Sequence, residues 1–293
     1  MDEASVFLLV LVVIILALAV FSYQGAAVGI PPYANPPNPN AEFGVIHDRR
    51  TGSGGSGRVE PYVNPPPPPP PPVLLERLET LRKNFKVSIS GAKSRDVKGE
   101  YVDIIYSGDE RLNISGWRIG NSRGAGFQLG HTTNLPGLTP IGNQDQLVAT
   151  KGARIHVVTA RSPIGSNFRA NKCVSYFTQF NAFRPSLPGP CPSPSREPGV
   201  DALSDKCFSY VRGNLNSCKT PLSLPFDLGN ECRDFISRVA TYDYCITNHR
   251  YDTDFYKNEW WTYLNREDPL WSDIRDVITL TDESGNVITT TSY

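Results

Sequence analysis

Apolar and polar residues alternate in short runs over the C-terminal part of the chain, and this pattern predicts β-strands. Between positions 101 and 106, the side chains of Val102, Ile104 and Tyr106 fall on one face of an extended chain. Asp103 marks the opposite face, which we expect to be the wetter one. The segment is therefore predicted to be a strand with one buried face.

A turn and a second alternating run follow this strand. Gly108 and Asp109 are typical turn residues, and apolar and polar side chains alternate over 112–119, which includes a tryptophan. This pattern predicts a β-hairpin or meander. The segment 276–288 has the same form, with turn residues at 282–286 between two apolar runs, and it predicts a closing hairpin.

These two segments resemble the lamin tail domain, an immunoglobulin-like β-sandwich found in nuclear lamins and in bacterial membrane-anchored and secreted proteins. The resemblance is carried by Glu100-Tyr101-Val102-Asp103-Ile104, Gly108-Asp109-Glu110, Ser115-Gly116-Trp117-Arg118-Ile119, the turn 282–286 and the terminal Tyr293. It covers 85–159 and 271–293, and it implies a sandwich with Trp117 in the core and no catalytic role for these residues. Family members usually cross the interval in a short loop, whereas this chain inserts residues 160–270.

Shorter patterns predict the remaining elements. Strands are expected at 85–89, 126–129, 146–149 and 154–159, and helices at 73–83, 227–247 and 254–264. Asn230 is a residue able to cap the second of these helices. We therefore expect a mainly β fold over 73–293, an immunoglobulin-like β-sandwich, with 160–270 as a Cys-rich, α-rich insertion.

The N-terminal segment predicts a single transmembrane helix. Residues 6–21 are an uninterrupted apolar run, which with its neighbours reaches the roughly 20 residues that span a bilayer. A cleaved signal peptide is the alternative, but Asp2 and Glu3 replace the basic residues that would open one. We assign 1–24 to the anchor.

Residues 25–72 form a predicted disordered linker. The segment is rich in proline, glycine and asparagine, and it ends in eight consecutive prolines at 65–72. In polyproline II geometry those prolines would make a stiff rod of about 25 Å. We interpret the linker as a spacer, with a docking site for a proline-binding domain as the alternative.

The cysteines predict disulfides and an oxidising compartment. All six lie in the insertion and none forms a CxxC pair: Cys173, Cys191, Cys207, Cys218, Cys232 and Cys245. A structural zinc site usually has two cysteines two to four residues apart, and no such pair exists here. We expect three disulfides, with the pairing left open, and an extracellular C-terminal domain. The residues flanking the apolar run carry too few positive charges to fix its orientation.

Charge and candidate chemistry narrow the class of function. The chain has 29 basic and 29 acidic side chains and no basic stripe, so we expect no nucleic-acid partner. The cluster of His249, Asp252 and Asp254, with Glu259 further on, suggests an exported metal-dependent hydrolase as an alternative function. We interpret the cluster instead as a solvated turn, and we predict no metal, no cofactor and no enzymatic activity.

Aromatic residues supply the candidate binding face. The insertion is dense in them, and we expect Tyr251, Tyr256, Trp260 and Trp261 to contact a partner. The predicted function is a membrane-anchored extracytoplasmic binding or structural module, whose partner is a surface protein or a polysaccharide. A pilus-like filament subunit is a further alternative, although the chain lacks a pilin-type leader.

Overall fold

The computed structural model describes residues 72–138, 144–215 and 218–293, which belong to one compact unit. The predicted membrane anchor and the linker up to residue 71 lie outside the described residues. Pro72, predicted to be the last linker residue, opens helix α2 (Pro72–Asn84). In the part of the chain that is described, no helix is both long and apolar enough to cross a membrane.

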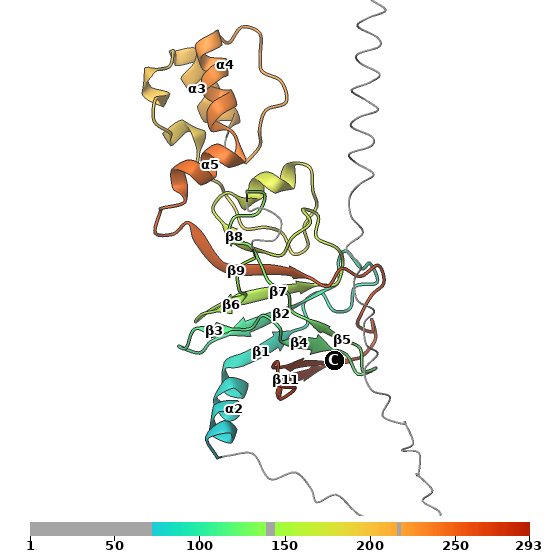
Figure 1. The fold of residues 1–293 in the computed structure, drawn as a ribbon. Helices are drawn as coiled ribbons and strands as arrows, with labels where there is room; N and C mark the ends of the chain where they lie inside the picture. The colour runs from blue at the N-terminus through green and yellow to red at the C-terminus, as the bar shows by residue number, and fades with distance from the viewer. Residues whose placement is uncertain (1–71, 139–143, 216–217) are drawn as a thin grey trace, which may run out of the picture. The chain divides into compact units, whose positions relative to one another are not determined.

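The fold is β-rich and is built on a five-stranded sheet (Figure 1). Its strands, in spatial order, are β1 (Phe85–Ser88), β2 (Tyr101–Tyr106), β7 (Arg154–Val158), β9 (Tyr256–Tyr263) and β8 (Phe168–Asn171). Neighbouring strands are antiparallel except for β7 and β9, which are parallel. The sheet is therefore mixed. The long chain segment between β7 and β9 provides the crossover that a parallel pair requires.

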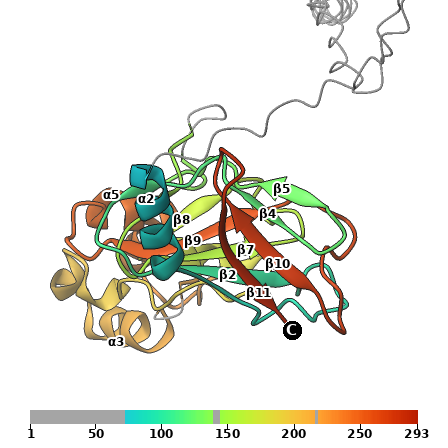
Figure 2. The ribbon, with the colours of Figure 1, turned by 90° about the horizontal axis from the view of Figure 1, so that it is seen from below.

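A four-stranded antiparallel sheet and a two-stranded sheet complete the frame. The first has the order β11 (Val287–Ser292), β10 (Val277–Thr281), β4 (Arg118–Gly120) and β5 (Gly126–Gln128), and the second pairs β3 (Leu112–Asn113) with β6 (Val148–Ala149). Strands β10 and β11 form the predicted closing hairpin (Figure 2). Its turn is closed by the Asp282 carboxylate, which accepts a hydrogen bond from the Asn286 N–H at 2.8 Å.

The predicted hairpin after residue 101 is wrong, although the strands themselves are present. β2 lies between β1 and β7, whereas β3 pairs with β6 and β4 pairs with β5 and β10. Alternation of apolar and polar side chains reports which face of a strand is buried and says nothing of its partner. The turn at Gly108 thus leads the chain from one sheet to another.

One apolar core joins the two larger sheets and α2. It contains residues such as Ile104 of β2, Ile119 of β4 and Leu280 of β10, all fully buried. Trp117 belongs to this core, as predicted, and its ring lies 5.0 Å from that of Phe85.

Helix α2 packs on the frame through one side only. Leu78 and Leu81 are buried in the common core, while Leu74 and Leu75 remain exposed. The helix predicted at 73–83 is thus confirmed, and only its second half is buried against the sheets.

The central strands of the five-stranded sheet are largely buried on both faces, so the face of β2 that was expected to be wet is covered. Asp103 of β2 is only 3% exposed, because a second apolar cluster that includes Phe168, Trp261 and Tyr263 covers this side of the sheet. Much of that cover comes from the insertion, whose packing the local pattern around Asp103 cannot report.

The insertion is smaller than predicted, since its first and last segments are strands of the sheet. β8 and β9 pair with each other, and the register places Asn171 opposite Tyr256. The helix predicted at 254–264 is wrong, because most of it is strand β9. Both faces of β9 are buried toward its end, so its apolar residues do not alternate with polar ones, and such runs do not distinguish strand from helix.

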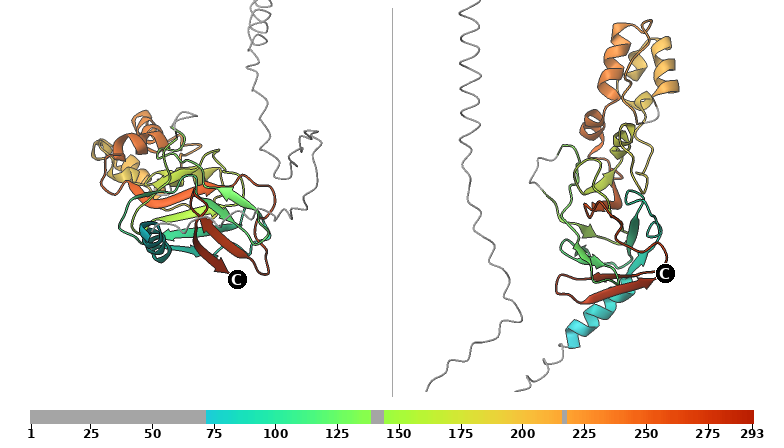
Figure 3. Two further views of the ribbon diagram at one scale, coloured as in Figure 1. Left: turned by 60° about the horizontal axis from the view of Figure 1, so that its bottom comes forward. Right: turned by 90° about the vertical axis from the view of Figure 1, so that its right-hand side faces the viewer.

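Between these strands, the described residues of the insertion (172–215 and 218–255) include three α-helices and three short 3-10 helices. They are η1 (Val174–Gln179), η2 (Pro194–Arg196), η3 (Val200–Ala202), α3 (Asp205–Asn214), α4 (Asn230–Val239) and α5 (Tyr242–His249). Figure 3 shows α3 and α4 side by side at the far end of the insertion.

The helix predicted at 227–247 is two helices. Thr241 interrupts it, because its side chain caps α5 by accepting a hydrogen bond from the Tyr244 N–H at 3.2 Å. Asn230 is not a cap, since the cap position of α4 is occupied by Gly229.

Candidate functional site

All six cysteines form disulfides, as predicted. The pairs are Cys173–Cys245, Cys191–Cys218 and Cys207–Cys232. The third bridge links α3 to α4 inside their own small apolar core. The first two lie in another small cluster with Ile246 and Phe255. Cys173–Cys245 fixes α5 to the chain that follows β8, and Cys191–Cys218 fixes the proline-rich segment to the chain between α3 and α4.

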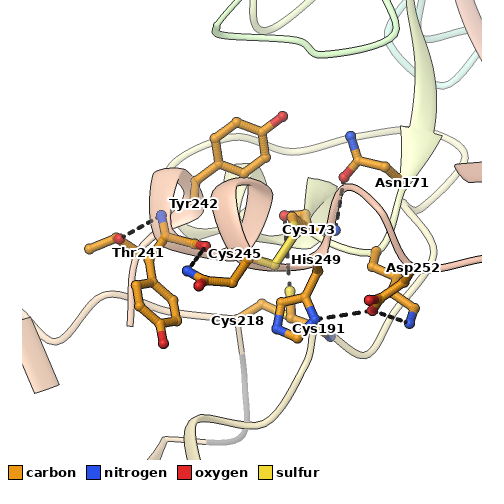
Figure 4. Close-up of a disulfide and its surroundings, with 12 residues drawn as sticks. Asn171, Cys173, Cys191, Cys218, Thr241, Tyr242, Cys245, His249 and Asp252 are labelled. Carbon is orange, nitrogen blue, oxygen red and sulfur yellow. Dashed lines mark hydrogen bonds and ion pairs between the residues drawn. A yellow bond between two sulfur atoms is a disulfide. The ribbon is translucent and has the colours of Figure 1, made fainter. Parts of the chain in front are cut away.

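A charged cleft of about 530 Å³ lies beside the Cys191–Cys218 bridge. Its walls come from the proline-rich segment 188–193, from η2 and the residue after it, and from the end of α5 with the following turn. Figure 4 shows His249 at the end of α5 next to this bridge, with its ring joined to Asp252. The cleft thus collects the polar cluster that the sequence indicates.

Both ring nitrogens of His249 face carboxylates. Nδ1 lies 3.1 Å from Asp252 Oδ2, and Nε2 lies 2.9 Å from Oε1 of Glu197, which is only 5% exposed. An imidazole that acts as a general base needs one nitrogen free to accept a proton from a nucleophile or water. In this arrangement both nitrogens of His249 are engaged, and the two contacts link the end of α5 to Glu197, the residue after η2, and to the turn at Asp252.

Lys172 occupies the position that a bound cation would need. Its ammonium group contacts Asp252 at 2.9 Å and also pairs with Asp254. The hydrogen bond to Asp254 raises the pKa of Lys172, and the same ammonium group lowers the pKa of both aspartates. Arg196 and Lys257 also line the cleft, so its three basic side chains balance the three carboxylates of Glu197, Asp252 and Asp254.

Glu259 is not part of this cluster. It lies in β9, on the five-stranded sheet, where its carboxylate is 3.8 Å from Nε2 of His156. Within residues 72–138, 144–215 and 218–293, no group of three or more His, Cys, Asp or Glu side chains is arranged to hold a metal ion. The metal-dependent hydrolase proposed from the sequence therefore receives no geometric support from its four named residues.

A second histidine, missed by the sequence analysis, forms a buried ionic pair. His156 Nδ1 lies 2.6 Å from Asp103 Oδ1, and both residues are at most 5% exposed. Burial acts to lower the pKa of His156, but the carboxylates of Asp103 and Glu259 outweigh it and raise the pKa. The ring also packs 4.4 Å from the Trp261 ring, so this pair is a structural element inside the sheet.

The four residues of the predicted aromatic binding face do not share one surface. Tyr251 is 80% exposed and Tyr256 is 37% exposed, whereas Trp260 and Trp261 are buried. Adjacent residues of a strand point to opposite faces, and each tryptophan enters a different core. The two tryptophans therefore cannot contribute to an exposed face.

Other exposed apolar side chains on the insertion were not predicted. Phe180, Leu222 and Phe226 are 73%, 82% and 96% exposed. Leu222 and Phe226 each adjoin a proline in the segment 221–226, outside any periodic run. For Leu222 and Phe226 the sequence signal is an apolar residue next to a proline and outside any helical or strand periodicity, and Phe180 has no such signal.

No family model, no curated protein and no solved structure matches this chain. The resemblance to the lamin tail domain therefore stays a prediction, carried by the residues quoted for it.

Proposed function

We propose that this protein is a membrane-anchored extracytoplasmic binding module. In this proposal the β-rich frame is an immunoglobulin-like sandwich of the lamin-tail type, the apolar run at 6–21 is the anchor, and the insertion contacts a partner. The observation that carries the proposal is that all six cysteines are paired within the insertion. Structural disulfides persist in oxidising compartments and are rare in the cytosol.

The insertion depends on these bridges for its rigidity. Its helices bury two small clusters, each built around disulfide cysteines, and each bridge typically contributes about 2 to 4 kcal/mol. A rigid insertion can keep apolar side chains such as Phe180, Phe226 and Tyr251 in water without collapsing around them. Exposed apolar side chains held in this way favour a contact surface for a partner protein or polysaccharide.

The side of the membrane can be tested on the full chain in intact cells. The variant Phe226→Cys adds a thiol at a fully exposed position of the insertion, and Asp2→Cys adds one before the apolar run. A membrane-impermeant maleimide should label Phe226→Cys in intact cells and Asp2→Cys only after permeabilisation. Labelling of Phe226→Cys only after permeabilisation would overturn the proposed localisation.

Binding can be tested with a photoreactive amino acid at the same position. A crosslinker replacing Phe226 should give a discrete adduct with a surface component, whereas one replacing Glu283, an exposed residue of the β10–β11 turn, should not. A second crosslinker replaces Tyr251, another exposed residue of the insertion. Equal adducts at 226 and 283, or no adduct at either 226 or 251, would contradict a contact surface on the insertion.

A further inference from the structure

A second cavity, of about 460 Å³, lies on the frame, away from the cluster around His249. It is bordered by Val148 of β6, Arg169 of β8 and Trp260 of β9, together with polar side chains of the segments 144–146 and 134. This cavity is not part of the contact surface proposed for the insertion.

Arg169 is fixed at this cavity with an uncompensated charge. Its guanidinium stacks 5.0 Å from the Tyr256 ring and 5.2 Å from the Trp260 ring, and its Nε donates to the Lys257 carbonyl at 2.9 Å. Among the described residues, no carboxylate lies within ion-pair distance of it. Burial lowers the pKa of Arg169, and the charge of Arg111, which lines the same cavity, lowers it further.

Two buried polar atoms of the lining residues also lack partners. Within the described chain, neither the indole N–H of Trp260 nor the side-chain oxygen of Asn134 has a hydrogen-bond partner. Trp260 is only 3% exposed, so this donor cannot rely on bulk water. Buried donors and acceptors are normally satisfied, and one of each beside a cavity indicates a ligand with both kinds of group.

The remaining residues around the cavity limit the charge and the chemical class of the ligand. Asp145 contributes one carboxylate, already held by the backbone and side-chain N–H groups of Asn134 at 3.0 and 2.8 Å. Against two arginines this leaves a single net positive charge, which matches a monoanion better than a doubly charged phosphate. Gln146 adds an amide, and the Thr150 hydroxyl, which donates to Asn258 Oδ1 at 2.9 Å, can still accept a hydrogen bond; both groups suit a ligand rich in hydroxyl groups.

We propose that this cavity binds a carboxylated sugar unit of an acidic polysaccharide, with Arg111 and Arg169 holding its carboxylate. A guanidinium presents N–H groups in the fork geometry that a carboxylate accepts. The hydroxyl groups of the sugar then have the amide, indole and carboxylate groups of the lining as partners. The inference rests on the proposed function in one respect, since such polysaccharides are met outside the cell.

The test uses the full chain in nanodiscs, with its four tryptophans labelled with ¹⁵N. D-glucuronate is the probe, with glucose, acetate and phosphate as comparisons, and Trp260→Phe assigns the Trp260 signal. We expect glucuronate to shift the indole N–H signal of Trp260 and to leave that of Trp271, buried elsewhere in the core, unchanged. Glucose and acetate should each bind about tenfold more weakly or worse.

The variants Arg169→Gln and Arg111→Gln should each weaken glucuronate binding by about tenfold or more. Arg111 is exposed, so its variant keeps the test valid if Arg169→Gln fails to fold. Arg212→Gln, at the exposed end of α3, is the matched control and should bind as the wild type does. The proposal is overturned if glucuronate leaves Trp260 unshifted, if acetate or phosphate binds as tightly, or if Arg111→Gln has no effect. None of these outcomes depends on the membrane topology, so this test and the labelling test fail separately.

Discussion

His156 lies on the covered face of the five-stranded sheet, between two carboxylates from neighbouring strands. The register pairs it with Asp103 on β2 and with Trp261 on β9. A buried ion pair contributes little to stability compared with an apolar pair of the same shape, but removing one partner leaves an unpaired charge in the interior. The pair therefore makes the packing of the insertion on the sheet sensitive to the state of a single side chain.

The raised pKa of His156 predicts a pH dependence of stability. The folded protein binds the His156 proton more tightly than the unfolded chain does, so the extra stability is fully present below the ordinary pKa of about 6.5. It is lost as the pH rises through the raised pKa of the folded state. Urea unfolding between pH 5 and pH 9 should show this decrease in the free energy of unfolding.

His156→Gln should remove this part of the pH dependence and should destabilise the protein by about 3 kcal/mol or less, because Asp103 stays buried with only Arg154, at 3.7 Å, as a charged partner. His131→Gln, at an exposed position, should leave both the stability and its pH dependence unchanged. A pH profile of His156→Gln that matches the wild type would show that the pair does not govern this titration.

At the scale of single elements, Thr241 decides where two helices meet. Its hydroxyl caps α5, so Thr241→Ala should destabilise the protein by about 1 kcal/mol. Thr247→Ala, at an exposed position of the same helix, removes a hydroxyl without removing a cap. Thermal unfolding followed by circular dichroism would compare them, and equal losses would reject the capping role.

Strands and helices could be predicted where one face is buried and the other is wet. The strands β1, β10 and β11 and the helix α2 follow this rule, and their predicted positions agree with the structure to within a few residues. β2 and β7 were also predicted as strands, although most residues on both of their faces are buried. β9 does not follow this rule. The common core buries Trp260 on one face, and the second apolar cluster, with Phe168 and Tyr263, buries Trp261 on the other. Its apolar residues therefore do not alternate with polar ones, and the pattern of this strand resembles that of a helix.

Partners in space could not be predicted from local pattern. The pairing of β2 with β7, the parallel pair β7–β9 and the three disulfide connections all join residues far apart in the chain. For the same reason, only some of the residues of the charged cleft could be predicted. His249, Asp252 and Asp254 are close in sequence, whereas Glu197 and Lys172 reach them only through the folding of the insertion.

At the scale of the whole molecule, the register of β8 and β9 defines which part of the chain can be removed. Asn171 and Tyr256 are opposite each other, so a two-residue Asn-Gly turn could join them in place of 172–255. We expect that variant to fold cooperatively with a lower melting temperature, because Phe183 and other cover of the outer face is lost. A variant lacking 160–270 loses both strands and should not fold.

Calorimetry of the two deletion variants compares these outcomes. If the shorter deletion unfolds without a cooperative transition, the frame is not independent of the insertion. If the longer deletion folds, then β8 and β9 are dispensable for the sheet.

The most direct test of the proposed extracytoplasmic module is disulfide mapping by mass spectrometry, on protein taken from its native membrane with thiols blocked at lysis. The account predicts three bridges, Cys173–Cys245, Cys191–Cys218 and Cys207–Cys232, and no blocked cysteine. Such a result would place the insertion in an oxidising compartment, where it can meet a partner outside the cell. Six blocked thiols would contradict the account and place the insertion in a reducing compartment.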